Sequence, residues 1–339
     1  MTGTTAWLRL RTPGLLLCLV IAVIASVAGF FVPLIGSALP AIIIGVVWAL
    51  VRRPGSRYAP GITTATKPLL QIAIVLLGAR MSLGQVADVG LESLPVLLSS
   101  LIVCLVAAWL IGRALGVERD TRILLGVGTG ICGASAIAAV APVIRANPAQ
   151  IAYAVSTIFL FNVAAVLTFP WVGHALGYDA RTFGLFAGTA VNDTSSVVAA
   201  ASIFSTAALG YAIVVKLVRT LALIPITVGL AIMEARRSLD PGSRIGPRKI
   251  VKLIPWFLFG FVLMVVLNTL VPFSTSVVDI LSGVSTFLIA AALAGIGLTT
   301  DVGAIRRAGW RPLLLGGILW ILVTGVTIGV IGLLDLASR

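Results

Sequence analysis

Three ionisable side chains stand inside apolar stretches of this sequence, where charged residues are rare. Asp193 belongs to the polar run NDTSS at 192–196, and Lys216 and Arg219 follow within the next apolar stretch. If these stretches cross a bilayer, each charge costs roughly 3 kcal/mol or more, so such residues usually bind a substrate or an ion. Lys216 and Arg219 are three positions apart and therefore share one helix face. We expect them to attract an anion, and Asp193 to pair with one of them when no anion is bound.

The glycine-rich stretch GVGTGICGAS at 126–135 contains G-x-G-x-x-G, the fingerprint of dinucleotide-binding loops. That fingerprint needs a preceding strand and an acidic residue about 20 positions later, but residues 146–160 hold neither Asp nor Glu. Two other interpretations remain. Small residues let membrane helices pack closely, and glycines also interrupt a helix and free backbone groups to line a polar cavity. We favour an interrupted helix, whose second half would begin near Ala134–Ser135 and aim its positive end at the middle of the membrane.

The run at 192–196 supports the same interpretation, with Asp193 as the cap of a second half-helix. Backbone N–H groups and hydroxyls at both interruptions, together with the two cations, are the donors that an oxyanion requires. Asn162, Gln71 and Arg80 are weaker candidates, because each serves equally well as a contact between helices or an anchor at the membrane surface. The predicted substrate-binding residues are Thr129, Gly133, Ser135, Asn192, Asp193, Thr194, Ser195, Lys216 and Arg219.

The elements that must position these residues are membrane-spanning helices. Hydrophobic residues make up 59% of the 339 residues and charged residues 10%, whereas a soluble domain carries about 25% charged residues. The apolar residues form runs of about 20, the length that crosses a bilayer. We therefore predict an all-α polytopic membrane protein with discontinuous helices and about eleven transmembrane spans. The expected spans are 13–31, 34–51, 67–80, 94–112, 123–143, 150–171, 182–204, 209–232, 253–271, 278–299 and 312–334.

We expect residues 1–339 to form a single integral membrane transport domain. The longest loop, 233–252, is basic and contains two prolines. It could join two halves, 1–232 and 253–334, although any cytoplasmic connection would also carry positive charge.

The distribution of Lys and Arg supports the eleven spans and orients them. With the N-terminus in the cytoplasm, only Arg80, Arg145 and Arg339 of the 24 basic residues lie in outer segments. Lys216 and Arg219 lie inside a span, so the other 19 lie in inner segments. Cytoplasmic loops of membrane proteins carry such an excess of positive charge. We therefore predict a multi-pass protein with a cytoplasmic N-terminus.

Two weak internal similarities indicate repeats. LLGARMSL at 76–83 resembles LAGIGLTT at 293–300, an offset of 217 that relates spans of opposite direction. GTGICGASAIAA at 128–139 resembles GTAVNDTSSVVA at 188–199, an offset of 60. Inverted repeats are common in secondary transporters. If all eleven spans cross the membrane, however, the two segments of the second pair are parallel to each other and are not inverted. Chance similarity between runs of small residues is the alternative for each pair.

Other classes of function find little support. The net charge of +13 sits in short loops between apolar spans, so it reflects topology, and we expect no nucleic-acid partner. The sequence has no G-x-x-x-x-G-K-[ST] loop for nucleotide phosphates and no metal-ligand spacing among its three cysteines. We expect neither an enzyme nor a cofactor. The expected partners are a small anionic substrate, the lipid bilayer and a coupling ion, H⁺ or Na⁺, and a homo-oligomer remains open.

Four motifs occur in order: GVGTGICGASAIAAVAPVI at 126–144, NDTSSVVAAA at 192–201, VKLVRTLALIPI at 215–226 and LAGIGLTTDV at 293–302. As a set they resemble the YeiH-like family of bacterial inner-membrane proteins, which are labelled sulfate exporters. The resemblance implies an integral transporter of the plasma membrane, related to inverted-repeat carriers of the bile-acid symporter type. In that fold the interrupted helices are antiparallel, whereas eleven crossing spans make the two glycine- and serine-rich spans parallel.

We predict a secondary transporter that exports a small anion, sulfate or a related sulfur oxyanion. A cation-coupled organic-anion carrier of the same architecture is the alternative. A membrane scaffold or sensor without transport is a third interpretation, and it predicts a dry interior in which Asp193 is fully paired.

Overall fold

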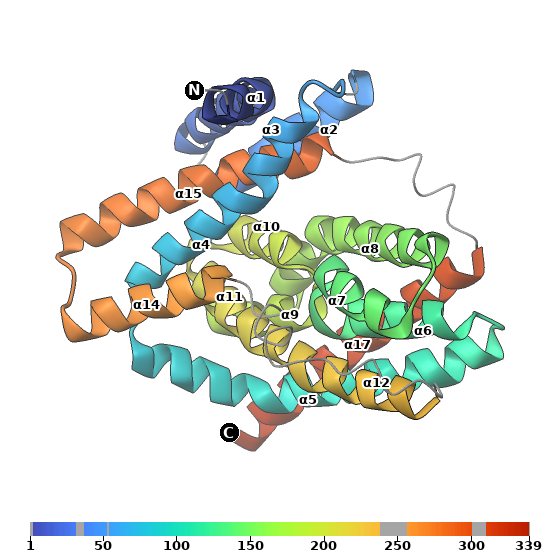
Figure 1. Ribbon diagram of the computed structural model, residues 1–339. Helices are drawn as coiled ribbons and strands as arrows, with labels where there is room; N and C mark the ends of the chain where they lie inside the picture. Colours follow the sequence, from blue (N-terminus) through green and yellow to red (C-terminus); the bar gives the residue numbers. More distant parts are fainter. Residues whose placement is uncertain (1–2, 32–36, 53, 238–255, 300–309, 339) are drawn as a thin grey trace. The chain divides into compact units, whose positions relative to one another are not determined.

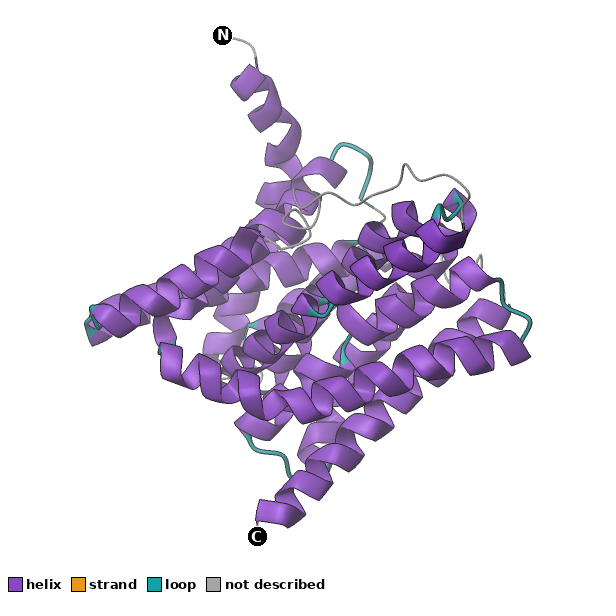
Figure 2. Cartoon of the chain, turned by 60° about the horizontal axis from the view of Figure 1, so that its bottom comes forward, coloured by secondary structure: helices purple, strands orange, loops and turns teal. Residues whose placement is uncertain are grey.

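The computed structural model describes residues 3–31, 37–52, 54–237, 256–299 and 310–338. Throughout these residues the regular structure is helical, without a strand (Figure 1). Seven of the described helices are long and apolar enough to cross a membrane, and four shorter apolar helices accompany them. The prediction of an all-α polytopic membrane protein is therefore confirmed. Figure 2 shows that short loops join the helices in the described part of the chain.

Contacts between helices divide the chain into two compact units, and neither unit is one continuous half of the sequence. Unit 1 lies within Met1–Val86 and Trp256–Val302, and unit 2 lies within Ala87–Pro255 and Gly303–Arg339. Most of the basic loop 233–252 lies outside the described residues.

Unit 1 holds two simple helices at its start, a continuous helical rod of four pieces with α, π, α and 3-10 geometry in turn, and two later helices. Close packing of α15 on α2 requires glycine, because a Cβ on Gly45 would lie 2.4 Å from the carbonyl oxygen of Ala294. Small residues allow such an approach of two backbones in a membrane. The elements are α1 (Gly3–Phe31), α2 (Ala38–Val51), α3 (Ala59–Thr64), η1 (Ala65–Leu69), α4 (Leu70–Leu77), η2 (Gly78–Arg80), α14 (Trp256–Leu270) and α15 (Thr275–Leu298).

The pair of segments at offset 217 lies in unit 1, and its members run antiparallel as expected. The hydroxyl of Ser285 in α15 donates to the carbonyl of Ala73 at 2.7 Å, whereas Gly295, later in α15, packs against Thr66, earlier in the rod. The matched glycines have different local structures, since Gly78 ends α4 and Gly295 lies inside α15. The two similar segments therefore run in opposite directions but do not share the same local structure.

Unit 2 holds every residue predicted to bind substrate, and both predicted helix interruptions are present in it. The first separates η3 from α7, and the second separates α9 from α10. The elements are α5 (Leu83–Ala114), α6 (Arg119–Val127), η3 (Gly128–Cys132), α7 (Ala134–Ile144), α8 (Pro148–Ala175), α9 (Ala180–Ala190), α10 (Thr194–Phe204), α11 (Thr206–Leu221), α12 (Leu223–Arg237) and α17 (Trp310–Ser338).

At the first interruption the chain turns back, so that α6, η3 and α7 form a first hairpin. Gly133 has φ 67° and ψ −133°, a conformation that side chains disfavour. Beyond it α7 returns along α6, because a Cβ on Gly128 would lie 3.1 Å from Cδ1 of Ile137. A continuous helix would separate these residues by about 13 Å. At the base, Gln150 at the start of α8 donates to Glu118 at 2.6 Å, just before α6.

Helices α9 and α10 form a second hairpin of the same kind. Phe183 near the start of α9 and Phe204 at the end of α10 stack with ring centroids 3.8 Å apart. His174 at the end of α8 stacks on Phe204 at 4.3 Å. The base of this hairpin therefore lies beside the end of α8, and its tip is the interruption before α10.

The two hairpins stand at opposite ends of α8 and point toward each other, which makes them an inverted repeat. The return arms confirm the offset of 60, because α7 begins and ends 60 positions before α10. The expectation that both segments cross in parallel is wrong, and the antiparallel relation implied by the resemblance holds. The count of basic residues was unable to reveal this. Two hairpins move Arg145 to the inner set and Arg181 to the outer set, and both totals stay the same.

Candidate functional site

The tips of the two hairpins meet inside unit 2. A Cβ on Gly133, at the first tip, would lie 3.0 Å from the Cβ of Asp193, at the second tip. These residues are the N-caps of the two return arms and occupy equivalent positions in the repeat. Two half-helices therefore end, and two begin, within a few ångströms of one another.

Lys216 of α11 binds both tips. Its side chain is 0% exposed, and Nζ donates to the carbonyl of Ile131 at 3.0 Å and to that of Val191 at 2.8 Å. These two carbonyls are 60 positions apart, so the ammonium group binds equivalent atoms of the two hairpins.

Arg219, on the same face of α11, repeats this pattern with its guanidinium group. Nη2 donates to the carbonyl of Thr129 at 2.8 Å, and Nη1 donates to that of Thr189, again 60 positions apart. Nε adds a bond to Gly130 at 2.8 Å, and Nη1 reaches Val191 at 3.4 Å. Arg219 is 1% exposed, so these bonds form away from solvent.

The carbonyls bound by the two cations are those that a helix leaves without partners at its C-terminal end. Each such end carries roughly −0.5 of an elementary charge. Two fixed cations facing two helix ends therefore neutralise an unfavourable convergence of negative dipole ends. The i, i+3 spacing of the cations is what lets one helix serve both hairpins.

Asp193 does not pair with either cation, which corrects the expectation drawn from the sequence. Its Oδ2 accepts from the backbone N–H of Ser195 at 3.1 Å and of Ser196 at 3.2 Å, and from the hydroxyl of Ser195. The predicted helix cap is therefore confirmed. The other oxygen, Oδ1, is buried without a hydrogen-bond partner, so Asp193 is not fully paired.

The first return arm lacks such a cap. Gly133 has no side chain to satisfy the N–H groups at the start of α7, and Ala134 and Ser135 are exposed. Thr194 and Ser195 at the start of α10 are half-buried. The accessible positive end at the tips therefore belongs mainly to α7.

Several neutral polar groups at the tips are buried without partners. The hydroxyls of Thr129 and Thr189 and both polar atoms of the Asn192 side chain have no hydrogen-bond partner. The backbone N–H of Asn192 donates to Oδ1 of Asn162 at 3.2 Å, which joins this weaker candidate to the site. Thr189 was not among the predicted residues, although the offset of 60 pairs it with Thr129.

The structure brings all nine predicted residues to the two tips and the facing part of α11, and leaves two weaker candidates elsewhere. Gln71 lies in unit 1, where its Oε1 accepts from Nε1 of Trp256 at 2.8 Å. Arg80 ends η2, also in unit 1, and is exposed.

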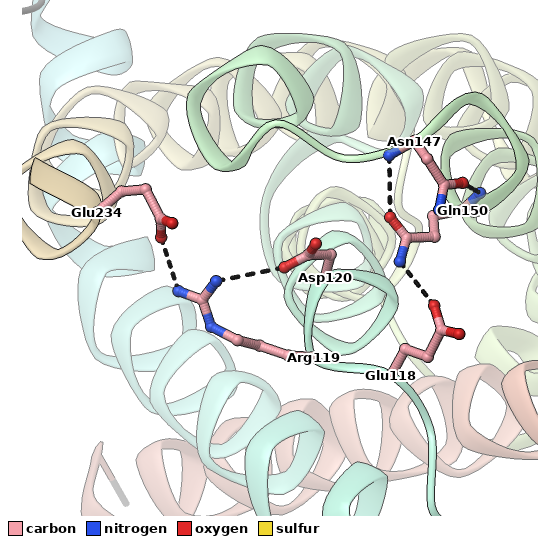
Figure 3. A network of polar contacts seen from close by, with 6 residues as sticks. All are labelled: Glu118, Arg119, Asp120, Asn147, Gln150 and Glu234. Carbon is pink, nitrogen blue, oxygen red and sulfur yellow. Dashed lines mark hydrogen bonds and ion pairs between the residues drawn. The ribbon is translucent and has the colours of Figure 1, made fainter. Parts of the chain in front are cut away.

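A polar network fixes the base of the first hairpin (Figure 3). Arg119, the first residue of α6, binds Glu234 of α12 at 2.9 Å and Asp120 at 3.3 Å. The side chain of Gln150 donates to Glu118 and so joins it to the capping box of α8. In this box the side chain of Asn147 accepts from the backbone N–H of Gln150 at 2.9 Å. The network ties α6 to α8 and to α12, the continuation of the helix that carries the cations.

Comparison with known proteins gives the same family over nearly the whole chain. The profile of a family described as conserved hypothetical protein 698 matches residues 13–316. A UPF0324 membrane protein of Streptococcus pyogenes is 41% identical over 325 residues, which cover 94% of this chain and 96% of the relative. Relatives with the same description from Streptococcus agalactiae and Fusobacterium nucleatum are each 39% identical, over 92% and 93% of this chain and 94% and 96% of their own. No solved structure matches.

Proposed function

The chain belongs to the UPF0324, or YeiH-like, family of membrane proteins, and we propose that it is a secondary carrier of a small anion. Sulfate or a related sulfur oxyanion is the leading candidate substrate. The observation that carries the proposal is the uncapped start of α7 beside two buried cations. We place the protein in the bacterial inner membrane with its N-terminus in the cytoplasm, so that the first hairpin enters from the cytoplasmic side.

The electrostatics of the tips favour an anion. The carbonyl ends of η3 and α9 are neutralised by Lys216 and Arg219, so the positive N-terminal ends of α7 and α10 are not offset by them. Asp193 offsets only the end of α10. The first turn of α7 then offers the backbone N–H groups of Ala134 and Ser135, and the hydroxyl of Ser135, to a ligand with several acceptor oxygens.

In this proposal Lys216 and Arg219 hold the binding geometry and supply long-range charge, while the start of α7 makes the contacts. Thr194 and Ser195 complete the site from the second tip. Tips that approach from opposite sides suit a carrier, because inverted repeats with interrupted helices place substrates near the middle of the membrane.

The test is counterflow of radiolabelled sulfate into liposomes that contain the purified protein and unlabelled sulfate. Sulfite, thiosulfate, taurine, chloride and a dicarboxylate serve as competitors, so that inorganic and organic anions are compared. Competition by sulfur oxyanions but not by the dicarboxylate supports the proposal. Absence of sulfate counterflow would refute it.

A variant locates the site. Ser135→Asp puts a carboxylate at the start of α7, where it offsets the dipole much as Asp193 does in α10. Because the carboxylate competes with the anion, we expect flux to fall about tenfold or more while the melting temperature holds or rises. Ser135→Ala is the matched control and should lose only a fewfold. Unchanged flux in Ser135→Asp would place the anion elsewhere.

A further inference from the structure

Carbonyl groups at the ends of interrupted helices have a known use in secondary carriers, where they coordinate the coupling Na⁺ or H⁺. In this protein those groups already hold cations. We propose that Lys216 and Arg219 are built-in replacements for a coupling cation, so that transport proceeds without Na⁺. The inference rests on the proposed function, and it excludes Na⁺ as the coupling ion of the same site.

The first support is the choice of atoms. Lys216 binds the carbonyls of Ile131 and Val191, and Arg219 binds those of Thr129 and Thr189. Each pair joins equivalent positions of the two hairpins. Side chains that merely filled space between helices would have no reason to select symmetry-related carbonyls at both tips.

The second support is saturation of the coordinating groups. The carbonyl of Val191 accepts from both cations, and that of Gly130 accepts from Nε of Arg219. A Na⁺ ion at these oxygens would have to displace a bonded donor. It would also meet two fixed like charges, and unit charges 4 Å apart repel by about 4 kcal/mol at an effective dielectric constant of 20.

One other set of oxygens at the tips could receive a cation. Oδ1 of Asp193, Oδ1 of Asn192 and the hydroxyls of Thr129 and Thr189 are buried without partners. The nearby cations disfavour Na⁺ there, and the hydroxyls can also donate to a water or an anion. Whether Na⁺ uses these oxygens is decided by the test.

The primary experiment measures sulfate counterflow with Na⁺, K⁺ or N-methyl-D-glucamine as the sole cation on both sides, at equal ionic strength. We expect rates equal within about twofold, because the structure needs no exchangeable cation at the carbonyls. A tenfold or larger loss on removal of Na⁺ overturns the inference and leaves the proposed function intact. No counterflow in any of the three media refutes the proposed function, and a binding measurement then decides the inference.

The binding measurement is thermal unfolding of the purified protein in NaCl and in N-methyl-D-glucamine chloride. The wild type should unfold at the same temperature in both salts, and a rise specific to Na⁺ overturns the inference. Lys216→Met frees the carbonyl of Ile131 and removes one of the two donors to that of Val191. This variant should gain a Na⁺-specific rise of about 3 °C or more, whereas Lys67→Met, an exposed matched control, should gain none. Absence of any Na⁺-specific rise in Lys216→Met counts against substitution at the carbonyls, and the wild-type comparison holds even if this variant does not fold.

Discussion

The two hairpins share one backbone plan but treat their helix starts differently. In the second hairpin, Asp179 caps α9 and Asp193 caps α10 with side-chain oxygens. In the first, Glu118 makes no side-chain cap to α6, and Gly133 has no side chain with which to cap α7. In both hairpins the same two cations bind the carbonyl end of the first helix. The start of the second helix is capped by a side chain in the second hairpin only. In the proposed function, the first hairpin therefore makes most of the contacts with the anion, and the second hairpin completes the site.

Removing either of the two cations that bind both tips should have the largest effect, because the contacts with both hairpins are lost at once. Arg219→Ala leaves the carbonyls of Thr129, Gly130 and Thr189 buried without donors, at about 1–3 kcal/mol each. We expect sulfate flux to fall about 100-fold or more, with membrane insertion retained, and Lys216→Ala to behave alike. Proteoliposome flux measures this, with Arg181→Ala, an exposed arginine, as control. Wild-type flux from both variants would remove the cations from the proposed site.

Replacing the glycine at the first tip should have the next largest effect. Gly133→Ala forces a side chain into a left-handed conformation with φ 67° and places its Cβ against Asp193, and we expect a loss of about 1–3 kcal/mol. Gly229→Ala, where a Cβ would meet nothing within 4 Å, should be neutral or stabilising. Thermal unfolding in detergent compares them. Equal melting temperatures would mean that the first tip does not depend on its glycine.

The second tip should depend on its carboxylate in a different way. Asp193→Ala removes the cap of α10 and should cost about 1 kcal/mol. Asp193→Asn keeps a capping oxygen but removes the charge, so stability should hold and the KM for sulfate should fall about two- to fivefold as repulsion is lost. Thermal unfolding and concentration-dependent counterflow separate the two roles. A higher KM in Asp193→Asn would instead assign the carboxylate a direct part in binding.

The base of the second hairpin should show the smallest effect. The backbone N–H of Thr182 donates to Asp179 at 2.8 Å and lowers the pKa of this carboxyl. A lowered folded-state pKa gives stability that is present above the unfolded value, about 3.9, and is lost as pH falls through the folded value. Melting temperature between pH 6 and pH 3 should therefore fall slightly more steeply in the wild type than in Asp179→Asn. Identical slopes would show that this cap does not contribute.

The sequence alone located the helices, the two interruptions and the residues that gather at the tips. Long apolar runs, the glycines near Gly133 and the capping residue Asp193 are local signals, which a sequence shows directly. The predicted partner of the cations was wrong for a matching reason. A carboxylate can be identified in a sequence. Every residue has a backbone carbonyl, however, and the sequence does not show which carbonyls a helix end leaves without partners.

Only the tertiary structure decided whether the interrupted segments cross or turn back. Hydropathy reports the length and apolarity of a segment but not its direction, and α6 to α7 together are long enough for either path. The distribution of basic residues did not distinguish the two paths either. Two hairpins move Arg145 to the inner segments and Arg181 to the outer segments, so the numbers of basic residues on the two sides stay the same. The direction emerges from contacts such as Phe183 on Phe204, between residues that lie far apart along a straight helix but adjacent in a hairpin.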